Sequence, residues 1–214
     1  MTGTAVTRVV LASRNAHKIE EMNRILDDAG LHVEVVGIDA FDDVPEVAET
    51  EATFEGNALL KARAVCAATG VPAVSDDSGL CVDALNGMPG VLSARWSGGK
   101  GDVANLELVL AQLGDTPDDR LDAQFRCAVA LVLPDGREAT VDGEMRGRLV
   151  REPRGSNGFG YDPIFVPDGE ERTSAELSDA EKDAISHRGN ALRALVPVLR
   201  ELVPNDQRPD GSVP

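Results

Sequence analysis

Two adjacent aspartates interrupt an apolar run in "PAVSDDSGLCVDAL", residues 72–85, where a strand that served only the core would continue with Val, Ile or Leu. Asp76 and Asp77 follow near the carboxyl end of a predicted strand, the place where open α/β sheets bind ligands. Neighbouring residues of an extended chain point to opposite faces, so only one carboxylate can enter a given site. We expect Asp77 to be a Mg²⁺ ligand or a general base for water, and Asp76 to face away and hold the turn. The alternative is an Asx-turn in which Asp77, Ser78 and Gly79 only turn the chain.

A polar turn, "SRNAHK" at residues 13–18, follows the first predicted strand. Where a strand gives way to a helix, free backbone N–H groups and the helix dipole favour an anion, and Lys18 adds a positive charge. The pattern is neither GxxxxGK[ST] nor GxGxxG. The alternative is an ordinary helix N-cap at Ser13 or Asn15 beside a solvated lysine.

Glycines surround an aromatic residue in "GSNGFGYDPIF", residues 155–165. Glycine lets the backbone approach a ligand closely, and Phe159 between two glycines can offer its flat face to a base. The alternative is a flexible loop whose Phe packs into the core.

Three further polar residues stand together in "EKDAISHRGNA", residues 181–191. On an unbroken helix His187 would lie about 140° and Arg188 about 240° from Lys182, so the three could not meet at one point. Either a ligand wraps around the helix end or the helix is irregular near Gly189. The alternative is a solvated helix face.

One ligand satisfies all of these groups at once. Phosphates suit the cations and backbone donors, a metal suits the aspartate, and a flat ring suits Phe159, so a nucleoside triphosphate with Mg²⁺ is the economical choice. The net charge of −16 argues against binding to duplex nucleic acid. No window approaches the roughly 18 apolar residues of a membrane span, and three isolated cysteines are typical of buried thiols in a reducing cytoplasm.

The elements that must position these groups alternate between strands and helices, which predicts an α/β fold. We expect strands at residues 6–12, at "HVEVVGI" (32–38) and at the start of the aspartate stretch. We expect helices from about residue 19 to Gly30, from about 54 to Gly70 and over 103–113. No linker separates two domains, so residues 1–203 are expected to form one domain and residues 204–214 a flexible tail.

The second half of the chain continues the pattern. "FRCAVALVL" and "REATVDGEMRGRLV" flank the turn "PDG" and predict a hairpin, and residues 163–166 predict a short strand. Ser178 and Glu181 form a capping box that opens one C-terminal helix, with a core stripe of Leu192, Leu195, Val196 and Leu199. Pro197 in that stripe predicts a kink or an early end.

Five segments together resemble the inosine/xanthosine triphosphate pyrophosphatases, hydrolases that remove non-standard purine nucleotides. They are "LASRNAHKIEE", "ETEATFEGNALLKARA", "PAVSDDSGLCVDALNGMPGVLSARWSG", "REPRGSNGFGYDPIF" and "SAELSDAEKDAISHRGNAL", in family order. The resemblance implies an elongated α/β fold with a mixed central sheet flanked by helices and a ligand cleft between two lobes. It also implies a cytoplasmic homodimer and Mg²⁺-dependent hydrolysis of ITP, dITP and XTP to the monophosphate and pyrophosphate.

The resemblance also implies roles for individual residues. Asp77 would be the catalytic residue and a metal ligand, and Glu49 of "ETEATF" the second metal ligand. Substrate would be bound by Ser13, Arg14, Asn15, Ala16, His17, Lys18, Ser78, Phe159, Gly160, Tyr161, Asp162, Lys182, His187 and Arg188.

Overall fold

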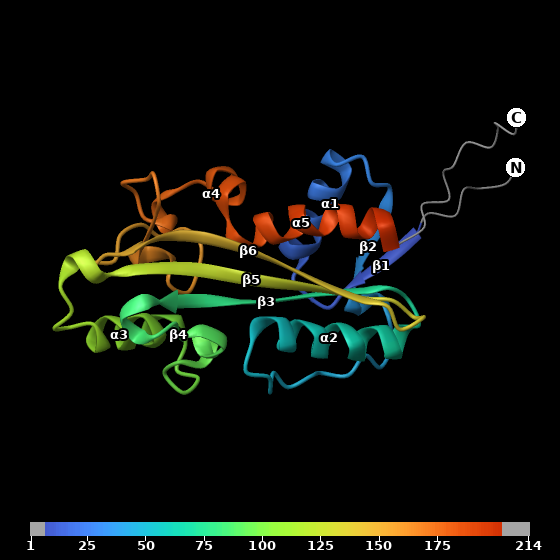
Figure 1. Ribbon diagram of the computed structural model, residues 1–214, viewed down its shortest axis with the longest axis horizontal. Helices are drawn as coiled ribbons and strands as arrows, with labels where there is room; N and C mark the ends of the chain where they lie inside the picture. Colours follow the sequence, from blue (N-terminus) through green and yellow to red (C-terminus); the bar gives the residue numbers. More distant parts are fainter. Residues whose placement is uncertain (1–6, 203–214) are drawn as a thin grey trace, which may run out of the picture.

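A mixed β-sheet runs the length of the molecule in the computed structural model, which describes residues 7–202 (Figure 1). The strand order is β2-β1-β3-β5-β6-β7, with β4 paired to β3 outside this path. β1 is parallel to β2 and β3, whereas β3, β5, β6 and β7 pair in antiparallel fashion. The predicted mixed sheet and α/β class are confirmed.

The strands are β1 (Thr7–Leu11), β2 (Val33–Gly37), β3 (Ala73–Val82), β4 (Met88–Pro89), β5 (Asp122–Val132), β6 (Glu138–Leu149) and β7 (Phe165–Pro167). The α-helices are α1 (Ala16–Asp28), α2 (Phe54–Thr69), α3 (Asp102–Gln112), α4 (Asp179–Ile185) and α5 (His187–Leu202). Figure 1 shows α2 on one face of the sheet and α1, α4 and α5 on the other. α3 packs Leu106 and Val109 into a separate cluster with Leu80 of β3 and Phe125 of β5. Each face therefore carries its own helical layer.

Local sequence explains where the second helix begins and ends. The Thr53 hydroxyl accepts a hydrogen bond from the Gly56 N–H, which is the expected N-cap. Gly70 adopts a left-handed conformation with φ of 67°, and its N–H donates to the Cys66 oxygen. The predicted β5–β6 hairpin across residues 133–137 is likewise confirmed.

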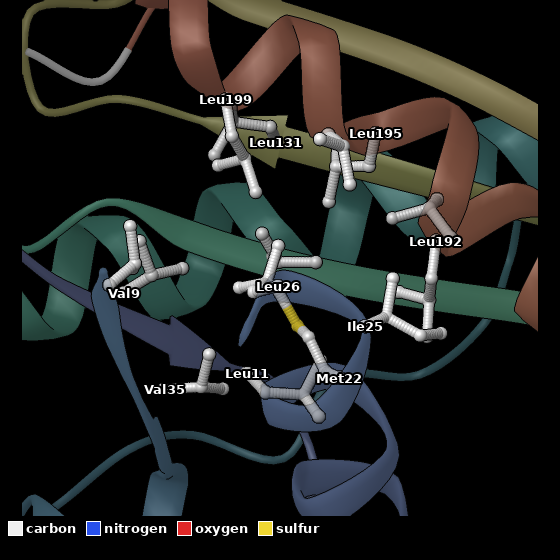
Figure 2. Packing of buried hydrophobic residues seen from close by; sticks show 14 of the residues in the cluster. Val9, Leu11, Met22, Ile25, Leu26, Val35, Leu131, Leu192, Leu195 and Leu199 are labelled. Carbon is white, nitrogen blue, oxygen red and sulfur yellow. The ribbon is translucent and has the colours of Figure 1, made fainter. Parts of the chain in front are cut away.

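The largest hydrophobic cluster lies between the sheet, α1 and α5 (Figure 2). α1 contributes Met22, Ile25 and Leu26, and α5 contributes Leu192, Leu195 and Leu199. Full burial of each such side chain contributes about 1.5–3 kcal/mol. The core stripe predicted for the C-terminal helix is thereby confirmed, and it fixes α5 against β5 and β6.

A glycine allows α5 to approach β6 closely. A Cβ atom added at Gly143 would lie 2.3 Å from the Ala191 nitrogen and 2.3 Å from the His187 oxygen. The Asn190 amide also donates to the Glu144 backbone oxygen at 2.9 Å. The start of α5 therefore rests directly on the strand backbone.

Several predictions of local structure were wrong in detail. The single C-terminal helix is two helices, α4 and α5, because the backbone at Ser186 is extended between them. Of the kink or early end predicted at Pro197, the early end is wrong, because α5 continues to Leu202. The short strand predicted at 163–166 is Phe165–Pro167, preceded by a 3₁₀ turn at Asp162–Ile164.

The remaining predictions concern cysteines, membranes and the tail. Cys66, Cys81 and Cys127 are buried free thiols, as expected. Within residues 7–202, no helix combines the length and apolar character needed to cross a membrane. The tail predicted at 204–214 lies outside the described residues.

Candidate active site

Asp76 and Asp77 lie inside β3 rather than in a turn, which corrects the prediction that Asp76 holds a turn. β3 continues past both residues because β5 pairs with it throughout, with Asp76 opposite Val129 and Asp77 opposite Ala128. The parallel partner β1 has already ended at Leu11, which is opposite Val74. Both aspartates therefore stand just beyond the carboxyl end of β1, and their side chains point to opposite faces of the sheet.

On the α2 face, Asp77 lies among polar side chains that α2 supplies. The Asn57 amide donates to Asp77 Oδ2 at 3.0 Å, and Lys61 Nζ lies 3.5 Å from Asp77 Oδ1. Asn57 and Lys61 are four residues apart and so share one side of the helix. Lys61 Nζ also lies 2.8 Å from Glu49 Oε1, and Arg95 holds the other Glu49 oxygen at 3.2 Å. Glu49 and Asp77 therefore meet at a single ammonium group.

These contacts separate the acidities of the two carboxylates. Burial raises the pKa of Asp77, and Lys61 only partly opposes this. Burial also acts on Glu49, but the hydrogen bond and charge of Lys61, with those of Arg95, hold its pKa below the ordinary value. Asp77 is thus the more proton-binding member of the pair, which suits a residue that accepts a proton from water.

The same carboxylates can be tested as a magnesium site. Among the described residues, no group of three or more His, Cys, Asp or Glu side chains could hold a metal ion by itself. Mg²⁺ in nucleotide enzymes is held by one or two carboxylates together with substrate phosphates and water. Asp77 and Glu49 already direct oxygens at one cation, the Lys61 ammonium. This donor set fits Mg²⁺ when phosphates complete it.

On the opposite face, Asp76 lies between two cations. Lys18 Nζ is 2.7 Å and Arg188 Nε 3.7 Å from Asp76 Oδ2, and Arg188 Nη1 is 3.3 Å from Glu21 Oε2. Burial raises the pKa of Asp76, but the charges of Lys18 and Arg188 outweigh it and lower that pKa below its ordinary value. Asp76 therefore remains an anion that holds both cations.

These cations border a cavity of about 610 Å³ between α1, α4 and the loop at residues 155–161, which we call the glycine-rich loop. Of the residues predicted to bind substrate, the cavity is lined by Asn15, His17, Lys18, Phe159, Lys182 and Arg188. Glu20, Glu21, Arg24, Asp179 and Asp183 add acidic and basic groups. The structure thus brings together segments that are some 170 residues apart.

The turn at residues 13–18 agrees in part with each of its two interpretations, an anion-binding turn and an ordinary helix N-cap. Asn15 is the N-cap of α1, since its side chain accepts from the His17 N–H, so the N-cap alternative holds. Lys18 is not a solvated lysine, however, because it is paired with Asp76. Ser13, Arg14 and Ala16 do not line the cavity, and Arg14 points to Asp39, 3.1 Å away.

The glycine-rich loop presents one aromatic ring and buries the other. Phe159 is 78% exposed, with Lys182 Nζ 5.2 Å from its ring centre, so the core alternative for Phe159 is wrong. Asp162 is buried, accepts a hydrogen bond from the Phe159 N–H at 2.8 Å and forms an ion pair with Lys182.

The other residues of this loop are held by the core and by α3. Tyr161 is a core residue whose hydroxyl donates to the Ser93 backbone oxygen, and the Gly160 N–H donates to the Asp102 carboxylate. Gly160, Tyr161 and Asp162 therefore shape the loop without lining the cavity.

The break between α4 and α5 explains how Lys182 and Arg188 can both line one cavity. The Ser186 hydroxyl accepts from the Gly189 N–H, which starts a new helix at His187. This confirms the alternative of an irregular helix. The His187 ring stacks on Phe125 with centres 5.0 Å apart, and burial, with the charge of Lys182, lowers its pKa to about 3. His187 and the exposed Ser78 are not part of the cavity lining.

Four residues that hold the predicted site residues in place were not predicted, namely Glu21, Asn57, Lys61 and Arg95. The spacing of Asn57 and Lys61 on one helix side was a usable signal in "NALLK". Arg95 reaches Glu49 from 46 residues away and left no such signal.

Known proteins are similar to this chain in sequence and in fold. A sequence profile of the Ham1 family matches residues 9–198. The chain is 60% identical over 199 residues to a dITP/XTP pyrophosphatase of Streptomyces avermitilis, which covers 92% of this chain and 100% of that protein. It is similar, at 55% identity and a TM-score of 0.77, to the crystal structure of a nucleoside-triphosphatase, dITP/XTP pyrophosphatase, from Mycobacterium abscessus, covering 91% and 100% of the two chains. A HAM1 protein from Coxiella burnetii matches with a TM-score of 0.85 at 43% identity, covering 92% and 100%.

Proposed function

Because the chain belongs to the Ham1 family, we propose that it hydrolyses ITP, dITP and XTP to the monophosphate and pyrophosphate, removing them from the nucleotide pool. One observation carries the proposal. Asp77, a carboxylate with a raised pKa, stands just past the end of β1, and the cavity that holds Lys18 and Arg188 opens on the other side of the same strand. A nucleotide whose base lies in the cavity can pass its phosphates over the end of β1, along residues 13–18, towards Asp77.

Binding of the base rests on the cavity residues. Phe159 offers a flat exposed ring, and Arg188 offers N–H donors to the 6-oxo group of hypoxanthine or xanthine. Adenine carries an amino donor at that position, so a donor from the protein would oppose it. Lys18 and Lys182 supply positive charge for the triphosphate.

Hydrolysis to these products requires water to break the bond between the α and β phosphates. Asp77 would accept the proton from this water, since its pKa is raised and its second oxygen is held by Asn57. We propose that Asp77 and Glu49 hold Mg²⁺, which would offset negative charge on the phosphate oxygens when bound. Lys61 would balance the two carboxylates and orient them.

The assembly and location follow as further proposals. We propose a homodimer, which size-exclusion chromatography with light scattering tests directly. A cytoplasmic location is supported by the buried free thiols and by the nucleotide pool on which such an enzyme would act.

The decisive experiment is the release of pyrophosphate by the purified protein. We expect Mg²⁺-dependent turnover with kcat/KM for ITP, dITP and XTP at least about 100-fold above that for ATP, the discrimination attainable when mismatched polar groups are buried. GTP belongs in the comparison because it shares the 6-oxo group. Similar kcat/KM values for all substrates would instead indicate a general nucleoside triphosphate pyrophosphatase.

A non-catalytic nucleotide sensor is the alternative from another class. It would bind ITP in calorimetry and leave it intact over hours with Mg²⁺ present. Release of monophosphate and pyrophosphate in equal amounts excludes this alternative.

A further inference from the structure

Resting on the proposed function, we propose that Asp76 is a positioning residue that couples Lys18, which contacts the triphosphate, to Arg188, which contacts the base. It acts from the face of β3 opposite Asp77. A change at the phosphate end of the cavity is then transmitted to base selectivity through this single carboxylate.

The geometry centres on one oxygen atom. Asp76 Oδ2 lies 2.7 Å from Lys18 Nζ and 3.7 Å from Arg188 Nε. Lys18 comes from α1 and Arg188 from α5, so this atom joins two helices that are distant in sequence. The Asp76 side chain is 6% exposed and that of Arg188 13%, whereas that of Lys18 is 30% exposed and open to the cavity. The carboxylate is thus enclosed, and of its two cations Lys18 is the more open to the cavity.

Arg188 is restrained on a second side as well. Its Nη1 lies 3.3 Å from Glu21 Oε2, and its Nη2 donates to the Lys18 backbone oxygen at 3.5 Å. Its Nε is buried and has no hydrogen-bond partner among the described residues, because 3.7 Å from Asp76 is too long for such a bond. A small movement of Asp76 towards Arg188 would satisfy this donor, and the contact with Lys18 at present opposes that movement.

The charges of the cluster indicate why position matters. Lys18 and Arg188 are balanced by Asp76 and Glu21, so the four groups together carry no net charge. Affinity and selectivity must then come from where the donors point. Replacing a whole buried ion pair by apolar groups is often neutral for stability, so the presence of all the charged groups together points to a role beyond stability.

The test measures binding of ITP and ATP by calorimetry in a protein with Asp77→Asn, which removes the proposed base. Lys18→Met is expected to weaken ITP binding and also to lower the ITP-to-ATP affinity ratio about 10-fold, within the range of coupling in a salt-bridge network. In a protein that also carries Asp76→Asn, Lys18→Met should leave the ratio unchanged. Asp76→Glu keeps the charge and should restore part of the ratio lost in Asp76→Asn.

Lys100→Met is the matched control, because Lys100 is an exposed lysine outside the cavity lining. It should change neither affinity. Thermal melts establish that each variant is folded. If Asp76→Asn fails to fold, the change in the ITP-to-ATP affinity ratio caused by Lys18→Met decides whether the coupling exists.

Equal weakening of ITP and ATP binding by Lys18→Met in a folded protein would overturn the coupling. If the wild-type protein releases no pyrophosphate, the proposed hydrolysis is overturned. The coupling remains supported in that case if Lys18→Met still lowers the ITP-to-ATP affinity ratio. Absence of ITP binding to the wild-type protein would overturn both.

Discussion

The two faces of β3 differ in what they do with a carboxylate. On the α2 face, Asp77 and Glu49 share Lys61, and burial raises the pKa of Asp77. On the α1 and α5 face, Asp76 lies between two cations, which lower its pKa. Adjacent residues of the same type thus acquire opposite acid–base properties, because the sheet separates their surroundings. The α2 face, with Asp77 and Glu49, is suited to chemistry. The α1 and α5 face, with Asp76, Lys18 and Arg188, is suited to recognition of the nucleotide, and we call it the recognition face.

The strongest test of this contrast is Asp77→Asn. We expect kcat for ITP to fall about 10³-fold with KM changed little, because an amide cannot accept the proton from water. Steady-state pyrophosphate release measures both constants. Asp122→Asn, an exposed aspartate at the start of β5, is the control and should be near wild type. Activity of Asp77→Asn within a few-fold of wild type would move the base elsewhere.

Gly143→Ala tests whether the recognition face depends on the close packing of α5. The added methyl group would overlap the α5 backbone, so we expect the free energy of unfolding to fall by about 3 kcal/mol, the upper part of the range for overpacking. Urea denaturation measures this loss. Gly114→Ala, whose methyl group would come no closer than 3.3 Å to the Ala111 oxygen, should cost much less. Equal losses for the two variants would contradict the close approach of α5.

His187 tests the burial of the recognition face through pH. Burial lowers the pKa of His187 to about 3, so below the ordinary value of 6.5 the unfolded chain binds a proton that the folded protein does not. Between pH 6.5 and 5 this should cost the folded protein about 2 kcal/mol, at 1.36 kcal/mol per pH unit.

The measurement is urea denaturation of wild type and His187→Gln at both pH values. The variant should lose about 2 kcal/mol less than wild type on acidification, since it lacks the titrating group. His17→Gln is the matched control, because the His17 side chain is 94% exposed, and it should behave as wild type. Parallel pH curves for wild type and His187→Gln would show that His187 takes up a proton in the folded state.

Phe159→Ala gives the smallest expected effect. Loss of stacking on the base should raise KM for ITP about 10-fold and leave kcat nearly unchanged, at the lower end of the energy range for base stacking. Phe159→Trp should retain near wild-type KM. Val103→Ala, which removes another exposed apolar side chain outside the cavity, is the control. An unchanged KM in Phe159→Ala would remove the ring from the proposed base site.

Local patterns predicted the elements and much of the recognition face. Turn chemistry predicted the β5–β6 hairpin, and an irregular helix near Gly189 was one of the two alternatives that helical geometry left open for Lys182 and Arg188. The continuation of β3 through Asp76 and Asp77 was missed, because it depends on β5, about 50 residues later in the chain. The burial of Tyr161 and His187, which the resemblance assigns to substrate binding, was missed for the same reason. Their burial depends on Ser93 and Phe125, which no local pattern connects to them.

The alternation of side chains in β3 makes this strand unusually intolerant of changes in length. Inserting or deleting one residue before Asp76 would exchange the faces on which the two aspartates appear, since a slip of one residue inverts a strand. Such a slip would also move Gly79 and place a residue with a side chain at its position, where a Cβ atom would lie 2.4 Å from the Ser93 hydroxyl. We therefore expect related chains to vary in length in the surrounding loops while keeping β3 free of insertions and deletions, even where individual residues of the strand have been replaced.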